Sequence, residues 1–228
     1  DPVFVGLPNA KPIHIRQIEH KTWKELISKY VDNKGKVDYR TWHAQQHDQD
    51  KIDLYLATLS SASTNRGTPA TKEQRLAFWI NAYNALTIKG ILREYPTTSI
   101  RNHTSRIWGY NIWHDLKLHV GDRTFSLDEI EHKVLRPMKE PRIHFAIVCA
   151  SIGCPRLLDE AYVPSRVDEQ LTLNVKDFFS REKNFRYDAA AKRFHLSSIL
   201  EWFAEDFGED QTQQLLRIRP WLPDGRAK

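Results

Sequence analysis

The run of residues from Leu76 to Leu92 constrains the fold more than any other part of the chain. Its sequence, LAFWINAYNALTIKGIL, is apolar nearly all round at helical spacing, which is typical of a helix buried at the centre of a domain. Thr71 can cap the start of such a helix and Pro96 ends it, so we predict a long central helix from Thr71 to Tyr95.

Two asparagines, Asn81 and Asn84, interrupt this apolar run. They are three positions apart and therefore share one face of the helix. A buried carboxamide costs free energy unless it is hydrogen bonded. We therefore expect both to bond the backbone of the loop at residues 149–155 or to help shape a site, and the structural role is favoured. We also expect the face that carries them to lie against this loop.

Hydrophobic periodicity and turn residues predict the other elements. Further helices are expected over residues 13–31, 39–59, 126–135, 165–179, 198–207 and 211–218. Short strands are expected over residues 116–120, 123–125 and 143–148, together with a hairpin of residues 184–187 and 193–196. Long helices come first and strands follow, which is typical of the α+β class.

The predicted fold is a helix-rich single domain with a small, mostly antiparallel sheet in its second half. A chain of 228 residues fits one large domain. The expected core covers about residues 20–220, and residues 1–12 and 224–228 are expected to be extended or frayed ends.

Charge and composition exclude several classes of protein. A formal net charge of +5 is only mildly basic and no nucleic-acid-binding module is recognisable, so we expect no nucleic-acid partner. No segment approaches the roughly 18 consecutive apolar residues of a membrane helix, so we expect no integral membrane segment. The two cysteines lack the second pair of a typical zinc site, and we predict no metal and no other cofactor.

Cys149 is the first candidate for chemistry. It follows the apolar run of residues 143–148 and enters a loop of small residues that includes Ser151 and Gly153. A thiol at the end of a strand can face a substrate, and backbone N–H groups of the loop can bind an oxyanion. The alternative is a buried structural cysteine, since free cysteine is among the most buried residue types. Cys154 is an alternative nucleophile, a resolving thiol or a disulfide partner of Cys149.

A thiol nucleophile needs a base, and two histidines are candidates. His132 follows Glu131 on the predicted helix of residues 126–135, and His144 begins the predicted strand that leads to Cys149. Five residues of extended strand span about 16 Å with opposite side-chain directions, so a direct pair of His144 and Cys149 requires a bend. The alternatives are a surface helix residue for His132 and a satisfied core imidazole for His144.

Three sequence blocks in order resemble domain-of-unknown-function family 547. They are FWINAYNAL at residues 78–86, SLDEIEHKVLRP at residues 126–137 and HFAIVCASIGCPRL at residues 144–157, and AYVP at residues 161–164 and WFAEDFG at residues 202–208 are similar to it as well. The resemblance runs from about residue 20 to about residue 220.

The resemblance implies a helix-rich α+β domain with a Glu–His–Cys site similar to that of cysteine peptidases and transglutaminases. Carried over by motif, the cysteine falls on Cys149, the histidine of its block on His144, and the IEH pair on Glu131 and His132. Cys154 matches a second thiol of many bacterial members. Bacterial members often follow a signal peptide, and this chain opens without Met, so we expect a periplasmic or secreted protein.

Two hypotheses of function follow. In the first, the chain is a thiol-dependent hydrolase or acyltransferase that acts on amide or thioester bonds of a peptide-like substrate. Cys149 attacks the carbonyl, His144 or His132 carries the proton, and Glu131 orients the imidazole; the loop at residues 150–153, with Asn81 or Asn84, binds the oxyanion. In the second, the chain is a non-catalytic binding module for a peptide, glutathione or another small thiol ligand.

Overall fold

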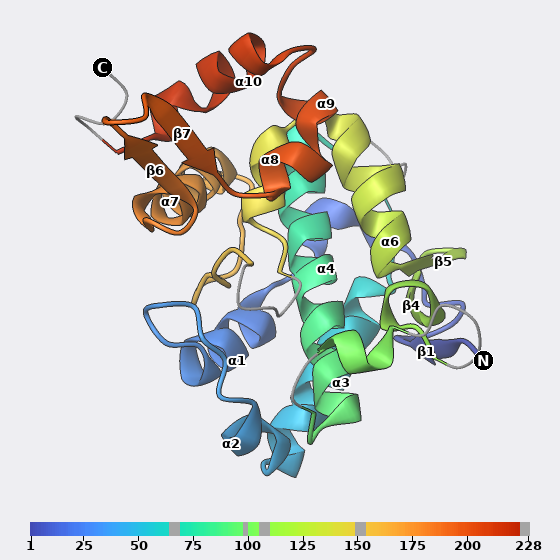
Figure 1. Cartoon of the computed structure of the whole chain (residues 1–228). Coiled ribbons are helices and arrows are strands. Elements are labelled where there is room, and N and C mark those ends of the chain that lie inside the picture. The colour runs from blue at the N-terminus through green and yellow to red at the C-terminus, as the bar shows by residue number, and fades with distance from the viewer. Residues whose placement is uncertain (64–68, 98–99, 105–109, 149–153, 224–228) are drawn as a thin grey trace.

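The computed structural model describes residues 1–63, 69–97, 100–104, 110–148 and 154–223. Helix α4 (Lys72–Glu94) runs through the middle of the molecule, and other helices surround it (Figure 1). Thr71 caps its first turn and forms a capping box with Gln74. Nearly every side chain from Leu76 to Leu92 is buried. The predicted central helix is therefore confirmed, with its capping residue.

The remaining helices are shorter, and they lie both before and after α4 in the sequence. The α-helices are α1 (Lys21–Tyr30), α2 (Tyr39–His43), α3 (Gln46–Leu59), α5 (Ile112–Asp115), α6 (Leu127–Glu129), α7 (Val167–Ser180), α8 (Ile199–Trp202), α9 (Ala204–Phe207) and α10 (Gln211–Ile218). The 3-10 helices are η1 (Ile15–Gln17), η2 (Ile100–His103), η4 (Arg136–Met138), η5 (Pro141–Phe145) and η6 (Arg219–Trp221), and η3 (Ile130–Leu135) is a π-helical stretch. None of the helices in the described part of the chain is long and apolar enough to cross a lipid bilayer.

The strands of the described residues form three small sheets. They are β1 (Val3–Val5), β2 (Ile13–His14), β3 (Ala62–Ser63), β4 (Leu116–Val120), β5 (Arg123–Ser126), β6 (Phe185–Asp188) and β7 (Arg193–Leu196). β1 pairs in parallel with β4, and β4 pairs antiparallel with β5. β2 and β3 form a parallel pair, while β6 and β7 form the predicted hairpin. The predicted α+β class is confirmed, although the sheet also takes a strand from the N-terminal segment.

Within the described ranges, buried apolar side chains form two clusters. The larger one surrounds α4 and includes side chains from α1, α3, β4 and α7. The smaller one consists of Phe145, Val175, Phe178, Phe179, Phe185, Ile199, Leu200, Phe207 and Ile218. The ring of Phe145 lies 4.9 Å from that of Phe178 and 5.2 Å from that of Phe179. This packing ties η5 to α7 and α9, and so fixes the backbone on either side of residue 145.

The predicted strand over residues 143–148 is wrong. Pro141 and Arg142 open 3-10 helix η5, and the side chain of Glu140 accepts a hydrogen bond from the Arg142 backbone N–H. The N–H groups of Ala146 and Ile147 both donate to the Ile143 carbonyl, which continues helical rather than extended backbone. An apolar run with β-branched residues is typical of any buried segment, so it does not by itself select a strand.

Three predicted helices are broken. The segment at residues 13–31 begins as β2 and η1 before α1, because Ile13–His14 pairs with Ala62–Ser63. The segment at residues 39–59 divides into α2 and α3. The predicted helix over residues 198–207 likewise divides into α8 and α9 at Phe203.

Candidate active site

His144 lies at the centre of a polar cluster where η5, η3 and α9 meet. Its side chain is 1% exposed, and its ring stacks on that of Phe203 with the centroids 3.9 Å apart and an interplanar angle of 18°. Nε2 lies 2.7 Å from Oδ2 of Asp206. Because its neighbour Phe145 is anchored in the smaller hydrophobic cluster, the imidazole is held between α9 and η3.

Asp206 is an ionised hydrogen-bond acceptor. Burial alone would raise its pKa, but hydrogen bonds from Arg136 and His144 outweigh burial and lower it. Arg136 donates from Nε to Oδ2 at 2.7 Å and from Nη2 to Oδ1 at 3.2 Å, and it also pairs with Glu205. An ionised carboxylate has no proton to donate, so the proton in the His144–Asp206 bond is carried by Nε2 of the imidazole.

The other ring nitrogen of His144, Nδ1, is buried and has no hydrogen-bond partner within the described ranges. Burial lowers the pKa of His144 despite the opposing effect of Asp206. The imidazole is therefore neutral near pH ~7, where even an unperturbed histidine has already lost most of its proton. A neutral ring with the proton on Nε2 leaves a lone pair on Nδ1, which is the arrangement that a general base requires.

Glu131 faces this free nitrogen from the π-helical stretch η3. Its Oε1 lies 3.9 Å from His144 Nδ1, and its Oε2 lies 3.5 Å from the hydroxyl of Tyr83 on α4. Burial raises the pKa of the Glu131 carboxyl. Single π-helical turns are often found at functional sites. The distance from Nδ1 is too long for a hydrogen bond, so Asp206 rather than Glu131 orients the ring.

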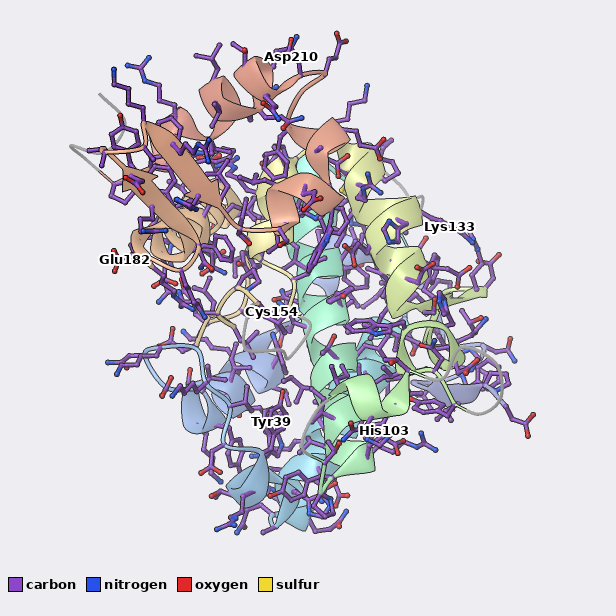
Figure 2. The ribbon with its side chains drawn as sticks, viewed as in Figure 1. Tyr39, His103, Lys133, Cys154, Glu182 and Asp210 are labelled. Atoms are coloured by element: carbon purple, nitrogen blue, oxygen red, sulfur yellow. The ribbon has the colours of Figure 1, made fainter. Side chains whose placement is uncertain are left out.

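His132 lies at the exposed edge of this cluster. Its side chain is 41% exposed, its Nδ1 lies 3.1 Å from Nη1 of Arg136, and its Nε2 lies 3.7 Å from Asp128. Lys133, the next residue, projects from the outer side of the same helix, where Figure 2 labels it. The structure therefore brings Glu131 and His144 together. His132 is exposed at the surface, as in the alternative that the sequence analysis gave for it.

Comparison with known proteins bears on this region directly. Residues 68–179 match the family model described as Protein of unknown function, DUF547. This part of the chain is a DUF547 domain. No curated protein and no solved structure matches the chain. The match is narrower than the range over which the sequence blocks resemble the family, and it includes α4, η3, η5 and most of α7.

Both asparagines of α4 bond the backbone of the DUF547 domain. The Nδ2 group of Asn84 donates to the Ala146 carbonyl at 3.0 Å, and Oδ1 accepts from the Val148 N–H at 3.0 Å. Asn81 forms the same pair of bonds with the N–H and carbonyl of Tyr162, at 2.9 and 2.8 Å. Asn84 therefore holds the backbone immediately before residue 149, and Asn81 holds it at residue 162. Each Nδ2 donor is already bonded to a backbone carbonyl, which supports the structural role over oxyanion binding.

The loop that carries the proposed nucleophile is only partly described. Cys149, Ser151 and Gly153 lie outside the described residues, and so does the predicted contact between the asparagine face and this loop. Cys154, labelled in Figure 2 on the segment that leads to α7, is disulfide-bonded. No cysteine of the described part of the chain is a free thiol.

Three residues of the cluster were missed by sequence reasoning: Phe203, Asp206 and Arg136. Phe203 and Asp206 lie beyond the matched range of the DUF547 domain, so the C-terminal segment completes the surroundings of His144. Both belong to the WFAEDFG block, which the sequence analysis assigned to a helix and found similar to the family, without giving its residues a role in the site. An acidic residue within an otherwise aromatic block was the available signal, since a carboxylate beside apolar side chains needs a partner.

Proposed function

We propose that this protein is a thiol-dependent hydrolase or acyltransferase that acts on an amide or thioester bond of a peptide-like substrate, with Cys149 as nucleophile and His144 as base. The observation that carries the proposal is the state of His144. Its ring is neutral, Nε2 is bonded to an ionised carboxylate, and Nδ1 is buried without a hydrogen-bond partner among the described residues. A histidine with one nitrogen oriented by a carboxylate and the other free is the base of a nucleophile–base–orienter arrangement.

The residues have separate roles in this reaction. The Cys149 thiol transfers its proton to Nδ1 of His144, and the thiolate attacks the substrate carbonyl. The imidazolium so formed is stabilised by Asp206 through Nε2–H, and by Glu131 when that carboxyl is ionised. His144 then returns the proton to the leaving amine or thiol. Water or another acceptor resolves the thioester on Cys149. Asp206 is a positioning residue, because it acts through His144.

Backbone position supports the choice of Cys149. Asn84 holds the carbonyl of Ala146 and the N–H of Val148, two residues after His144 and directly before Cys149. The backbone from Pro141 to Phe145 is helical, so the 16 Å separation expected for an extended strand does not apply. A backbone that is not extended up to Ile147 supports a direct pair of His144 and Cys149.

The oxidation state of the cysteines decides whether this chemistry can occur. Cys154 is disulfide-bonded, and a cysteine in a disulfide is neither a nucleophile nor titratable. The proposed activity therefore belongs to the reduced protein. Disulfides persist in oxidising compartments, so this bond also supports a periplasmic or secreted location, which we propose here. The same bond favours the second candidate function, a binding module for a peptide or glutathione-like ligand without turnover.

The rate of iodoacetamide labelling at each cysteine tests the proposal. The protein is labelled with and without prior reduction from about pH 4 to about pH 9, and each site is quantified by peptide mass spectrometry. We expect Cys149 of the reduced protein to label with a midpoint well below the ordinary thiol pKa of about 8.5, and Cys154 to serve as an internal comparison.

Two variants make the test specific. His144→Gln should move the Cys149 midpoint up to the ordinary range, whereas His132→Ala, at the exposed histidine of the same region, should leave it unchanged. Thermal unfolding of each variant confirms that it is folded. A Cys149 midpoint at or above about 8.5 in the reduced wild-type protein would reject the nucleophile and favour the binding module.

A further inference from the structure

A cavity of about 540 Å³ lies away from His144, between the N-terminal segment and the β4–β5 hairpin. Its lining comes from four separate parts of the chain: the segment from Asn9 to Ile15, strand β3, the first turns of α4, and the hairpin from Val120 to Phe125. Figure 1 shows β1, β4 and β5 side by side near the N-terminus, where this hairpin lies. The volume is in the range of small-molecule sites, about 300–1,000 Å³.

The walls of the cavity are held by backbone hydrogen bonds, so the space is preformed. The N–H of Ile13 donates to the Ser61 carbonyl at 2.8 Å, and the N–H of Gly121 donates to the Ser60 carbonyl at 2.9 Å. Gly121 has a φ of +62°, which a glycine adopts without strain and which turns β4 into β5 at the rim. Both sides of the cavity are therefore fixed to the same turn of the chain after α3.

The floor is aromatic. Phe78 and Trp79, consecutive residues of α4, have their rings 5.1 Å apart at 87°, and Trp79 meets Phe125 of β5 edge to face at 4.8 Å. All three rings line the cavity and all three are largely buried. Such a surface fits an apolar or aromatic group of a ligand.

The guanidinium of Arg123 lies beside this aromatic floor. Arg123 and Phe125 are two residues apart on β5 and share a face of the strand. The Arg123 guanidinium lies 4.9 Å from the centre of the Phe125 ring, and it forms no ion pair with a carboxylate of the described ranges. A guanidinium presents two parallel N–H donors, which match a carboxylate. Asp122 beside it disfavours a doubly charged anion such as a phosphate monoester.

We propose that this cavity binds a small monocarboxylate with an aromatic or branched apolar body, with the body on Phe78, Trp79 and Phe125 and the carboxylate on Arg123. A second cavity, of about 440 Å³, shares Asp122 and Arg123 with the first and leaves room for a polar extension of the ligand. The site does not depend on the thiol chemistry proposed for Cys149, since none of its residues belongs to the cluster around His144.

Hydrocinnamate, a phenyl ring on a short carboxylate chain, is the probe. Amide and indole N–H shifts of the isotope-labelled full chain are followed by NMR while hydrocinnamate is added. We expect saturable shifts at Trp79 and Gly121 with a Kd on the order of 1 mM, as for a ligand of this size. Hydrocinnamide lacks the charge and should bind at least about tenfold more weakly, the ratio that one charged hydrogen bond supplies. Acetate lacks the phenyl ring and should also bind at least about tenfold more weakly, because it buries little apolar surface.

Arg123 variants show whether the guanidinium is responsible. Arg123→Gln should weaken hydrocinnamate about tenfold or more. Arg193→Gln is the matched control. Arg193 also begins the second strand of an antiparallel hairpin, but it does not line the cavity. Arg123→Glu should reverse the preference and favour phenylpropylamine, a result that a purely structural arginine would not produce. Absence of saturable shifts at Trp79 and Gly121, or equal affinity in Arg123→Gln, would overturn the proposal.

Discussion

Replacing Asn84 with alanine removes the clamp on the backbone that precedes Cys149. Val148 N–H and Ala146 C=O each lose their partner, and both residues are nearly inaccessible to solvent. An unsatisfied buried backbone group costs about 1–3 kcal/mol, so two of them cost about 2–6 kcal/mol. A water molecule can enter the space left by the carboxamide and recover part of this, which lowers the expected loss to about 2–4 kcal/mol.

Urea and thermal unfolding followed by circular dichroism measure this loss. For a chain of this length, each kcal/mol lowers the melting temperature by about 2–4 °C, so Asn84→Ala should melt about 4–16 °C below wild type. Asn81→Ala is the matched control, because it removes the same pair of bonds from the same helix face, at Tyr162 instead. Both variants should lose similar stability, but only Asn84→Ala should change the labelling rate of Cys149. The reasoning fails if Asn84→Ala unfolds within about 0.5 kcal/mol of wild type.

Three further predictions rest on single contacts. Hydrogen bonds lower the pKa of Asp48 to about 2. The ionised carboxylate therefore stabilises the fold fully above its unfolded pKa of about 3.9, and this stabilisation is lost as pH falls toward 2. The loss of unfolding free energy in Asp48→Asn, measured in urea, should shrink over that pH range. Gly35→Ala should cost about 1–3 kcal/mol in urea unfolding, because φ is +76° there and the new methyl would lie 2.3 Å from Cβ of Arg156. Arg136→Gln removes a positive charge that lowers the pKa of His144, so NMR titration should show that pKa rise, and an unchanged value would contradict the assignment.

The parts of the fold that depend on local pattern were predictable from the sequence. The central helix was predicted from residues that are apolar nearly all round, and the β4–β5 and β6–β7 hairpins from alternation and turn residues. The capping box of Ser126 and Glu129 was also found, although the helix it opens becomes π-helical after Glu129. In these cases the residues that determine an element are neighbours in sequence.

The parts that depend on distant partners were not predictable. Strand β1 forms because Val3 pairs with Leu116. A strand of three residues is too short for its sequence pattern to predict such a partner. The segment after His144 is not a strand because a side chain of α4, more than 60 residues earlier, takes its backbone hydrogen bonds. Asp206 likewise reaches His144 across 62 residues. One sequence shows the residue types but not these pairings.

The tautomer and charge of His144 test the central claim most directly. Nitrogen NMR of the histidine side chains, with His144→Gln used to assign the signal, reports which ring nitrogen carries a proton. At about pH 7 we predict a neutral ring in reduced protein carrying Cys149→Ala, with the proton on Nε2 and the lone pair on Nδ1. A proton on Nδ1, or a ring that is fully protonated at that pH, would contradict the account, because His144 could then not accept the proton of a thiol.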